Sequence, residues 1–76
     1  MQVEFRKLQE IIAGVLSLGL EEITENARFV EDLGADSLEL FQILMDVEKE
    51  FDLEIAFQDI ASIYTVGEAF QLIQES

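Results

Sequence analysis

One long amphipathic helix is predicted by residues 36–51, DSLELFQILMDVEKEF. Five apolar residues recur there every three or four positions, which places them on one helical face. Asp36 is a favourable N-cap residue, and Glu39 three positions later completes a capping box. We therefore predict a helix from Ser37 to Phe51 that packs against the rest of the chain. Its packing stripe consists of Leu40, Ile43, Leu44, Val47 and Phe51.

The same helix carries a second apolar stripe, Leu38, Phe41 and Met45, which points away from the first. A surface helix needs only one apolar face. Two interpretations are open: another segment of the chain covers this stripe, or a partner protein docks on it. Residues 31–54 contain nine acids and a single base, Lys49. Because acids surround the stripe, we favour docking to a partner with a basic surface.

Upstream of this helix, apolar spacing predicts a first helix over about residues 3–16. A long, mostly polar connection follows it. In a small domain such a loop usually carries function or covers the core. We expect four apolar residues to hold it against the core: Ile23, Phe29, Val30 and Leu33.

Downstream, residues 65–68 form a second capping box, Thr65 to Glu68, that opens a last helix. Its apolar face is Val66, Ala69, Phe70 and Ile73. A short helical turn is expected between Phe57 and Ile63, and no segment alternates with the period of a strand. The predicted fold is all-α: a small four-helix bundle of three main helices and one short helix, with a long first loop. We expect a single domain over residues 1–76.

Composition narrows the function classes. The 17 acidic and 4 basic residues give a net charge of −13, which disfavours binding to nucleic acid or to an anionic membrane. The sequence contains no His and no Cys, so it lacks the usual general base, thiolate nucleophile and transition-metal ligands. An EF-hand loop starting at Asp32 would place Ile43 where a bidentate Glu is required, so no metal site is predicted. We expect a protein that is not an enzyme.

Two further absences bear on location. The sequence shows no basic leader followed by an apolar stretch, so no signal peptide is predicted. Its apolar runs are far shorter than the roughly 20 residues that span a bilayer. We expect a cytoplasmic protein.

Ser37 is the residue with the clearest chemical potential. It falls at the first position of the predicted helix, just after a turn containing Gly34, so its hydroxyl should be exposed. A helix N-terminus favours a phosphate group. The chain has no base to activate this hydroxyl, so Ser37 is either a residue that another enzyme modifies or a plain helix N-cap.

The stretch Asp32-Leu33-Gly34-Ala35-Asp36-Ser37-Leu38 resembles the phosphopantetheine attachment motif of acyl carrier proteins, in the form typical of dissociated bacterial fatty acid synthesis. The resemblance extends over nearly the whole chain. It includes the loop Glu21–Thr24, the lead-in Phe29–Asp32, the helix end Glu48–Phe51 and the helix start Thr65-Val66.

The resemblance implies a function as a carrier of acyl intermediates. A phosphopantetheinyl transferase would attach 4'-phosphopantetheine from coenzyme A to Ser37, with Asp36 beside it. The thiol of that arm would hold acyl groups as thioesters and present them to fatty acid synthesis enzymes with basic docking patches. The implied protein is a monomer. Its docking residues would be Leu38, Glu39, Phe41, Met45 and Glu48, and its acyl chain would slip between helices beside Leu44, Val47, Ile60 and Ile63.

Several positions depart from the family pattern. Gln42 and Lys49 stand where glutamates are common, and Asp46 stands where a small residue is common. Residues 56–58 replace a more polar, proline-led segment. These departures leave open a dedicated carrier for a polyketide or other specialised lipid pathway. A separate alternative rests on the apolar and acidic stripe alone: a noncatalytic adaptor that docks through its second helix without using Ser37.

Overall fold

The computed structural model describes residues 4–56, 58–59 and 62–75. Its helices are α1 (Phe5–Leu16), the 3-10 helix η1 (Leu20–Glu22), α2 (Ser37–Phe51) and α4 (Val66–Gln74). Within the described residues there is no strand, only an isolated bridge between Arg28 and Thr65. The all-α prediction is confirmed, and the start and end of α2 agree with the predicted ones.

The short helical elements differ from the prediction. The helix η1 lies inside the first loop, where a connection without helix was expected. The turn expected between Phe57 and Ile63 includes residues 57, 60 and 61, which lie outside the described residues. Its described part contains two turn hydrogen bonds, from the Asp59 N–H to the Ala56 carbonyl at 3.0 Å and from the Ser62 N–H to the Asp59 carbonyl at 3.3 Å.

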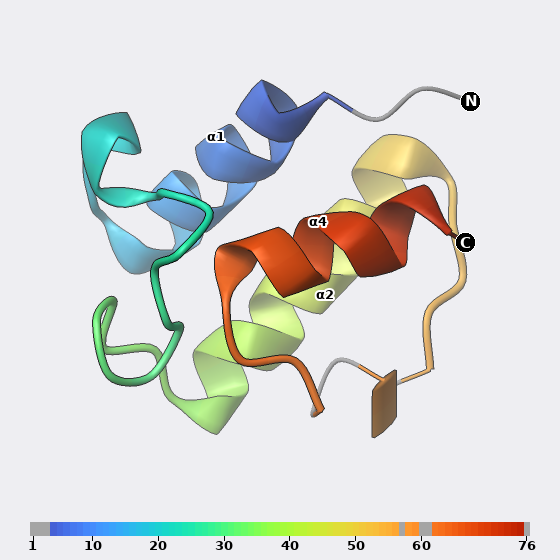
Figure 1. Cartoon of the computed structure of the whole chain (residues 1–76). Coiled ribbons are helices and arrows are strands. Elements are labelled where there is room, and N and C mark those ends of the chain that lie inside the picture. The colour runs from blue at the N-terminus through green and yellow to red at the C-terminus, as the bar shows by residue number, and fades with distance from the viewer. Residues whose placement is uncertain (1–3, 57, 60–61, 76) are drawn as a thin grey trace.

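The three main helices share one hydrophobic core (Figure 1). Helix α1 packs along α2, and α4 meets α1 through an edge-to-face contact of Phe70 with Phe5, whose ring centroids lie 5.2 Å apart. The predicted packing stripe of α2 is confirmed, with Leu40 partly buried and the other four residues buried. The most deeply buried large side chains are Leu8, Ile12, Ile23 and Val66.

The long first loop is anchored by two of the four predicted residues in full and by a third in part. Ile23 and Phe29 are buried, and Leu33 packs against the core. The prediction for Val30 is wrong, because its side chain is 62% exposed. Phe29 and Val30 are neighbours in a tight turn, and the turn that directs Phe29 into the core directs Val30 outward.

Backbone hydrogen bonds tie this loop to the start of α4. The Phe29 N–H donates to the Tyr64 carbonyl at 3.1 Å, and the Val66 N–H donates to the Ala27 carbonyl at 3.0 Å. The Gly67 N–H donates to the Glu25 carbonyl at 2.9 Å, and a Cβ on Gly67 would lie 3.0 Å from that oxygen. The loop is therefore held at a fixed position before α2 begins.

No helix in the described part of the chain is long and apolar enough to cross a membrane.

Candidate functional site

Ser37 is the first residue of α2, and its side chain is exposed. The cap of this helix is Asp36: the Glu39 N–H donates to Asp36 Oδ1 at 2.8 Å, and the Asp36 N–H donates to Glu39 Oε1 at 3.1 Å. This reciprocal pair confirms the predicted capping box. The interpretation of Ser37 as the N-cap is wrong, because Asp36 already fills that role. The hydroxyl of Ser37 is left at the surface without a capping function.

The loop in front of Ser37 keeps that hydroxyl accessible. Gly34 adopts a φ of +71°, a left-handed conformation that favours glycine, and a Cβ at this position would meet nothing within 4 Å. The next residue, Ala35, is buried, and its N–H donates to the Phe29 carbonyl at 2.8 Å. The chain thus turns at Gly34, is anchored at Ala35 and enters α2 with open space on the side of the turn.

The start of α2 suits a phosphate ester. The first turn of an α-helix presents backbone N–H groups without intrahelical acceptors, and the helix dipole places positive charge there. In α2 the Asp36 carboxylate accepts a hydrogen bond from the Glu39 N–H, whereas the N–H groups of the two helical residues before it have no acceptor within the helix. The exposed hydroxyl, the unfilled space at Gly34 and this helix end together fit a phosphate-linked arm on Ser37.

The second apolar stripe of α2 is on the surface. Leu38 is 76% exposed, Met45 49% and Phe41 43%. The interpretation in which another segment covers the stripe is therefore wrong. The three residues begin one position after Ser37 and continue along the helix for two turns, so a protein docked on them would also reach the Ser37 hydroxyl.

The predicted docking acids also have structural contacts. Both Glu39 and Glu48 are partly buried. Glu39 belongs to the capping box, while Glu48 Oε2 accepts a hydrogen bond from the Ile55 N–H at 2.8 Å and so holds the segment that follows α2. Of the residues that depart from the family pattern, Gln42 donates through Nε2 to Asp46 Oδ1 at 2.9 Å.

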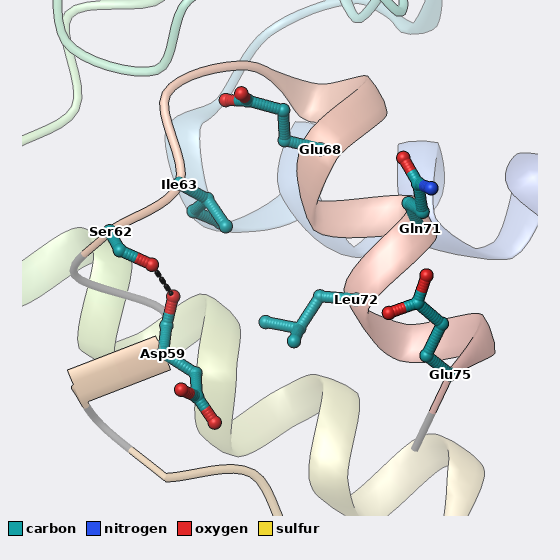
Figure 2. Close-up of a pocket in the computed structure, with 7 residues that line it drawn as sticks. All are labelled: Asp59, Ser62, Ile63, Glu68, Gln71, Leu72 and Glu75. Carbon is teal, nitrogen blue, oxygen red and sulfur yellow. Dashed lines mark hydrogen bonds between the residues drawn. The ribbon is translucent and has the colours of Figure 1, made fainter.

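The predicted acyl-chain residues are only partly brought together. Leu44 and Val47 are each 3% exposed in the core, and Ile63 packs against that core from its edge. Ile60 lies outside the described residues. A surface hollow of about 310 Å³ lies between α4 and the segment before it, and Figure 2 shows Ile63 and Leu72 facing each other there. This hollow is not lined by Leu44 or Val47. Among the described residues, its lining consists of Asp59, Ser62, Ile63, Glu68, Gln71, Leu72 and Glu75.

A cluster around Arg28 escaped prediction. Arg28 Nε and Nη2 donate to Asp32 Oδ2 and Oδ1 at 3.1 and 3.2 Å, and Nη1 donates to Glu31 Oε2. The Tyr64 hydroxyl donates to Glu31 Oε1 at 2.9 Å. Hydrogen bonds from Arg28 lower the pKa of Asp32, and the bond to Glu31 raises the pKa of Tyr64. The spacing of Arg28 from Glu31 and Asp32 is a local signal, whereas the contact with Tyr64 spans 33 residues.

Comparisons with known proteins agree with this geometry. A family model described as "Phosphopantetheine attachment site" matches residues 6–73. An acyl carrier protein of Clostridium perfringens is 44% identical over 71 residues, which cover 93% of each chain. The chain belongs to the acyl carrier protein family. A second acyl carrier protein, from a Sulfurovum species, is 39% identical over 70 residues, 92% of this chain and 93% of its own.

Structural comparison supports the same family. A solved structure from Mycobacterium tuberculosis, assigned as an acyl carrier protein, superposes with a TM-score of 0.85 and 37% identity. The match covers 93% of this chain and 95% of the other. The protein is thus an acyl carrier with a phosphopantetheine attachment domain, and its cofactor is 4'-phosphopantetheine. Its partners are a transferase and synthase enzymes.

Proposed function

We propose that Ser37 is the residue that receives the 4'-phosphopantetheine arm. The observation that carries this proposal is the division of roles at the start of α2, where Asp36 caps the helix and Ser37 is exposed. A capping serine would have its hydroxyl engaged with the backbone, whereas Ser37 presents its oxygen to an approaching enzyme. The chain supplies no His to deprotonate that oxygen, so the transferase must bring the base.

The chain's own residues position the arm and do not catalyse. When bound, the arm supplies the thiol on which acyl groups are carried as thioesters. Ser37 would hold the phosphodiester of the arm at the positive end of α2, and Asp36 fixes that end by closing the capping box. This division of labour supports a carrier that is not itself an enzyme.

We further propose that partner enzymes dock on the exposed stripe of α2. Leu38, Phe41 and Met45 supply apolar contact, and Met adapts to differently shaped partners. Basic side chains of a partner would meet the acids around the stripe, with Glu39 and Glu48 offering whichever lone pairs their structural hydrogen bonds leave.

An acyl chain on the arm could enter the core of the protein or the surface hollow of Figure 2. Entry beside Leu44 and Val47 requires the core to open, because both residues are almost fully buried. Ile63 lies on the boundary between that core and the surface hollow of Figure 2. We propose that a bound chain passes Ile63 and displaces core contacts of α2, with Ile60 predicted on the same path.

We assign the carrier to fatty acid synthesis, acting as a single-domain monomer in the cytoplasm. The relatives named as acyl carrier proteins support the carrier role in this assignment. Asp46 with its Gln42 partner, and Lys49, change the charge pattern of α2 and favour a dedicated carrier as the second candidate. Loading assays with fatty acid synthase enzymes against polyketide synthase enzymes separate these two candidates.

The decisive experiment is intact mass before and after incubation with coenzyme A, Mg²⁺ and a broad-specificity phosphopantetheinyl transferase. We expect the wild type to gain one arm and Ser37→Ala to gain none while keeping its helix content. Ser62→Ala is the matched control, since Ser62 is also exposed but donates its hydroxyl to the Asp59 carbonyl. Attachment to Ser37→Ala would refute the assignment. No gain on the wild type with several transferases would favour the adaptor.

A further inference from the structure

The two carboxylates nearest upstream of the capping box are occupied within the chain. All four oxygens of Glu31 and Asp32 accept side-chain hydrogen bonds, three of them from the guanidinium of Arg28 and one from the Tyr64 hydroxyl. Asp32 Oδ2 also accepts from the Arg28 N–H at 2.8 Å. We call these four residues the Arg28 cluster. Arg28, Glu31 and Asp32 are each a little under half exposed, so the cluster lies at the surface.

The cluster lies close to the proposed attachment residue. Glu31 and Asp32 precede Ser37 by six and five residues, and the hydrogen bond from the Ala35 N–H to the Phe29 carbonyl folds this loop back on itself. Figure 1 shows the loop returning directly into the start of α2. A partner enzyme that reaches Ser37 therefore also comes near these two carboxylates.

Arg28 is one of only four basic residues in this acidic chain. It is the sole base between Lys7 and Lys49 in the sequence. Its planar fork is suited to hold carboxylates at fixed angles, and here it serves two of them at once. Hydrogen bonds from Arg28 also lower the pKa of Asp32, as expected for a carboxylate paired with a guanidinium.

We propose that Arg28 is a specificity-determining residue that withholds Glu31 and Asp32 from partner enzymes. Because the guanidinium offsets their charge and every oxygen already accepts at least one side-chain hydrogen bond, these acids form weaker ion pairs with a partner's Lys or Arg side chains than unpaired acids would. Recognition is then confined to the exposed stripe of α2 and the acids along it. This inference rests on the proposed function, in which a basic partner approaches Ser37. It adds that a residue outside α2 selects against partners that need acids in the preceding loop.

The test is a double-mutant cycle on the rate of arm attachment. The first variant, Arg28→Gln, removes the guanidinium, and the second, Glu31→Gln with Asp32→Asn, removes both charges. For each we would measure kcat/KM of a transferase for the carrier, with coenzyme A saturating, at low and at high salt. The cycle matters because charges that act only through the overall field contribute independently, whereas withheld carboxylates do not.

We expect Arg28→Gln to raise kcat/KM about twofold at low salt, and this gain to disappear at high salt where exposed charges are screened. The acid variant should change the rate less than about twofold in the wild type but lower it about fivefold in the Arg28→Gln background. Arg6→Gln is the matched control: it also removes one positive charge, from α1, whose N-terminal turn lies at the far end of the molecule from the start of α2 (Figure 1). Its rate should stay near that of the wild type.

Equal effects of the acid variant in both backgrounds would overturn the proposal, and so would equal effects of Arg28→Gln and Arg6→Gln. Should Arg28→Gln fail to fold, Arg28→Lys is the replacement, because it keeps the charge but not the planar fork. Its kcat/KM should lie between that of the wild type and the twofold gain expected for Arg28→Gln. A rate for Arg28→Lys at or below the wild type would likewise contradict it. Failure of the underlying function looks different, because the wild type itself would then take no arm.

Discussion

Helices α2 and α4 start in the same way and put their first residue to opposite uses. Each opens with a capping box, Asp36 with Glu39 in α2 and Thr65 with Glu68 in α4. In α4 the first helical residue, Val66, is completely buried, whereas in α2 the corresponding residue is the exposed Ser37. The local motif therefore sets where a helix begins, and the direction of the first side chain sets what the helix start does.

The helices also differ along their length. Helix α4 buries Ala69 and Ile73 and places Phe70 against Phe5, so its apolar residues are used within the fold. Helix α2 has a buried stripe and also an exposed one that ends at Met45. We expect the start of α4 to contribute mainly to stability and the start of α2 to serve the proposed function, and substitutions at matched positions should separate the two roles.

The largest effect is expected from Val66→Ala. It removes two buried carbons from a fully enclosed site, which should lower the free energy of unfolding by about 2–3 kcal/mol. Urea unfolding followed by circular dichroism measures this loss. While it is folded, at urea concentrations below its unfolding midpoint, Val66→Ala should still accept the arm. Ser37→Ala should instead keep its stability and lose arm attachment. A variant of Val66 that keeps its stability, or loses attachment while folded, would break the contrast between the two helix starts.

Next in size is Met45→Glu on the exposed stripe of α2. We expect about a tenfold weaker affinity for a partner enzyme, because a charge then occupies an apolar contact. The free energy of unfolding should change by less than about 0.5 kcal/mol, as for other exposed positions. Ile73→Glu on the buried face of α4 is the converse control and should unfold the protein. A large loss of stability in Met45→Glu would return that residue to the core.

The features that depend on local spacing in the sequence were predicted correctly. Both capping boxes and the two stripes of α2 follow from residues three or four positions apart, and the structure has them. Val30 was misplaced because spacing does not show which of two adjacent apolar residues a tight turn directs inward. The second role of Glu48 depends on the Ile55 N–H, whose position is set by how the chain leaves α2.

The candidate site likewise has a part that local sequence predicts and a part that it does not. Ser37 could be singled out because its motif is contiguous, and the family resemblance rests on the same residues. The Arg28 cluster could not, because the contact of Tyr64 with Glu31 depends on how the loop packs against the segment before α4. A contact across 33 residues leaves no periodic signal in the sequence.

A smaller effect should distinguish the two caps. Thr65→Ala and Asp36→Ala each remove the acceptor of an N-terminal hydrogen bond and should each lower the free energy of unfolding by about 1 kcal/mol. Asp36→Ala should also slow arm attachment, since it alone loosens the helix start that carries Ser37. Asp36→Asn keeps a capping oxygen, so its free energy of unfolding should stay near that of the wild type. Its rate of arm attachment then reports the effect of losing the charge alone. Equal attachment rates in Thr65→Ala and Asp36→Ala would show that the α2 cap has no functional role.

The smallest effect is a pH dependence at the start of α4. Glu68 Oε1 accepts the Thr65 N–H at 2.9 Å and also the Tyr64 N–H, and these hydrogen bonds lower the pKa of Glu68 below its ordinary value of 4.5. A carboxyl whose pKa is lowered by folding stabilises the fold at pH values above its unfolded pKa. That contribution is lost as the pH falls through the folded pKa.

Comparing thermal unfolding of the wild type and Glu68→Gln isolates this contribution, because Gln still completes a capping box but carries no charge. The wild type should have the higher midpoint at pH 7, and the difference should stay constant down to about pH 5 and then shrink as Glu68 takes up a proton. The net charge of −13 falls over the same range in both proteins, so its effect largely cancels in the difference. A difference that persists unchanged to pH 3 would mean that the carboxylate acts by shape alone. The two capping boxes would then differ only in which way their first residue points.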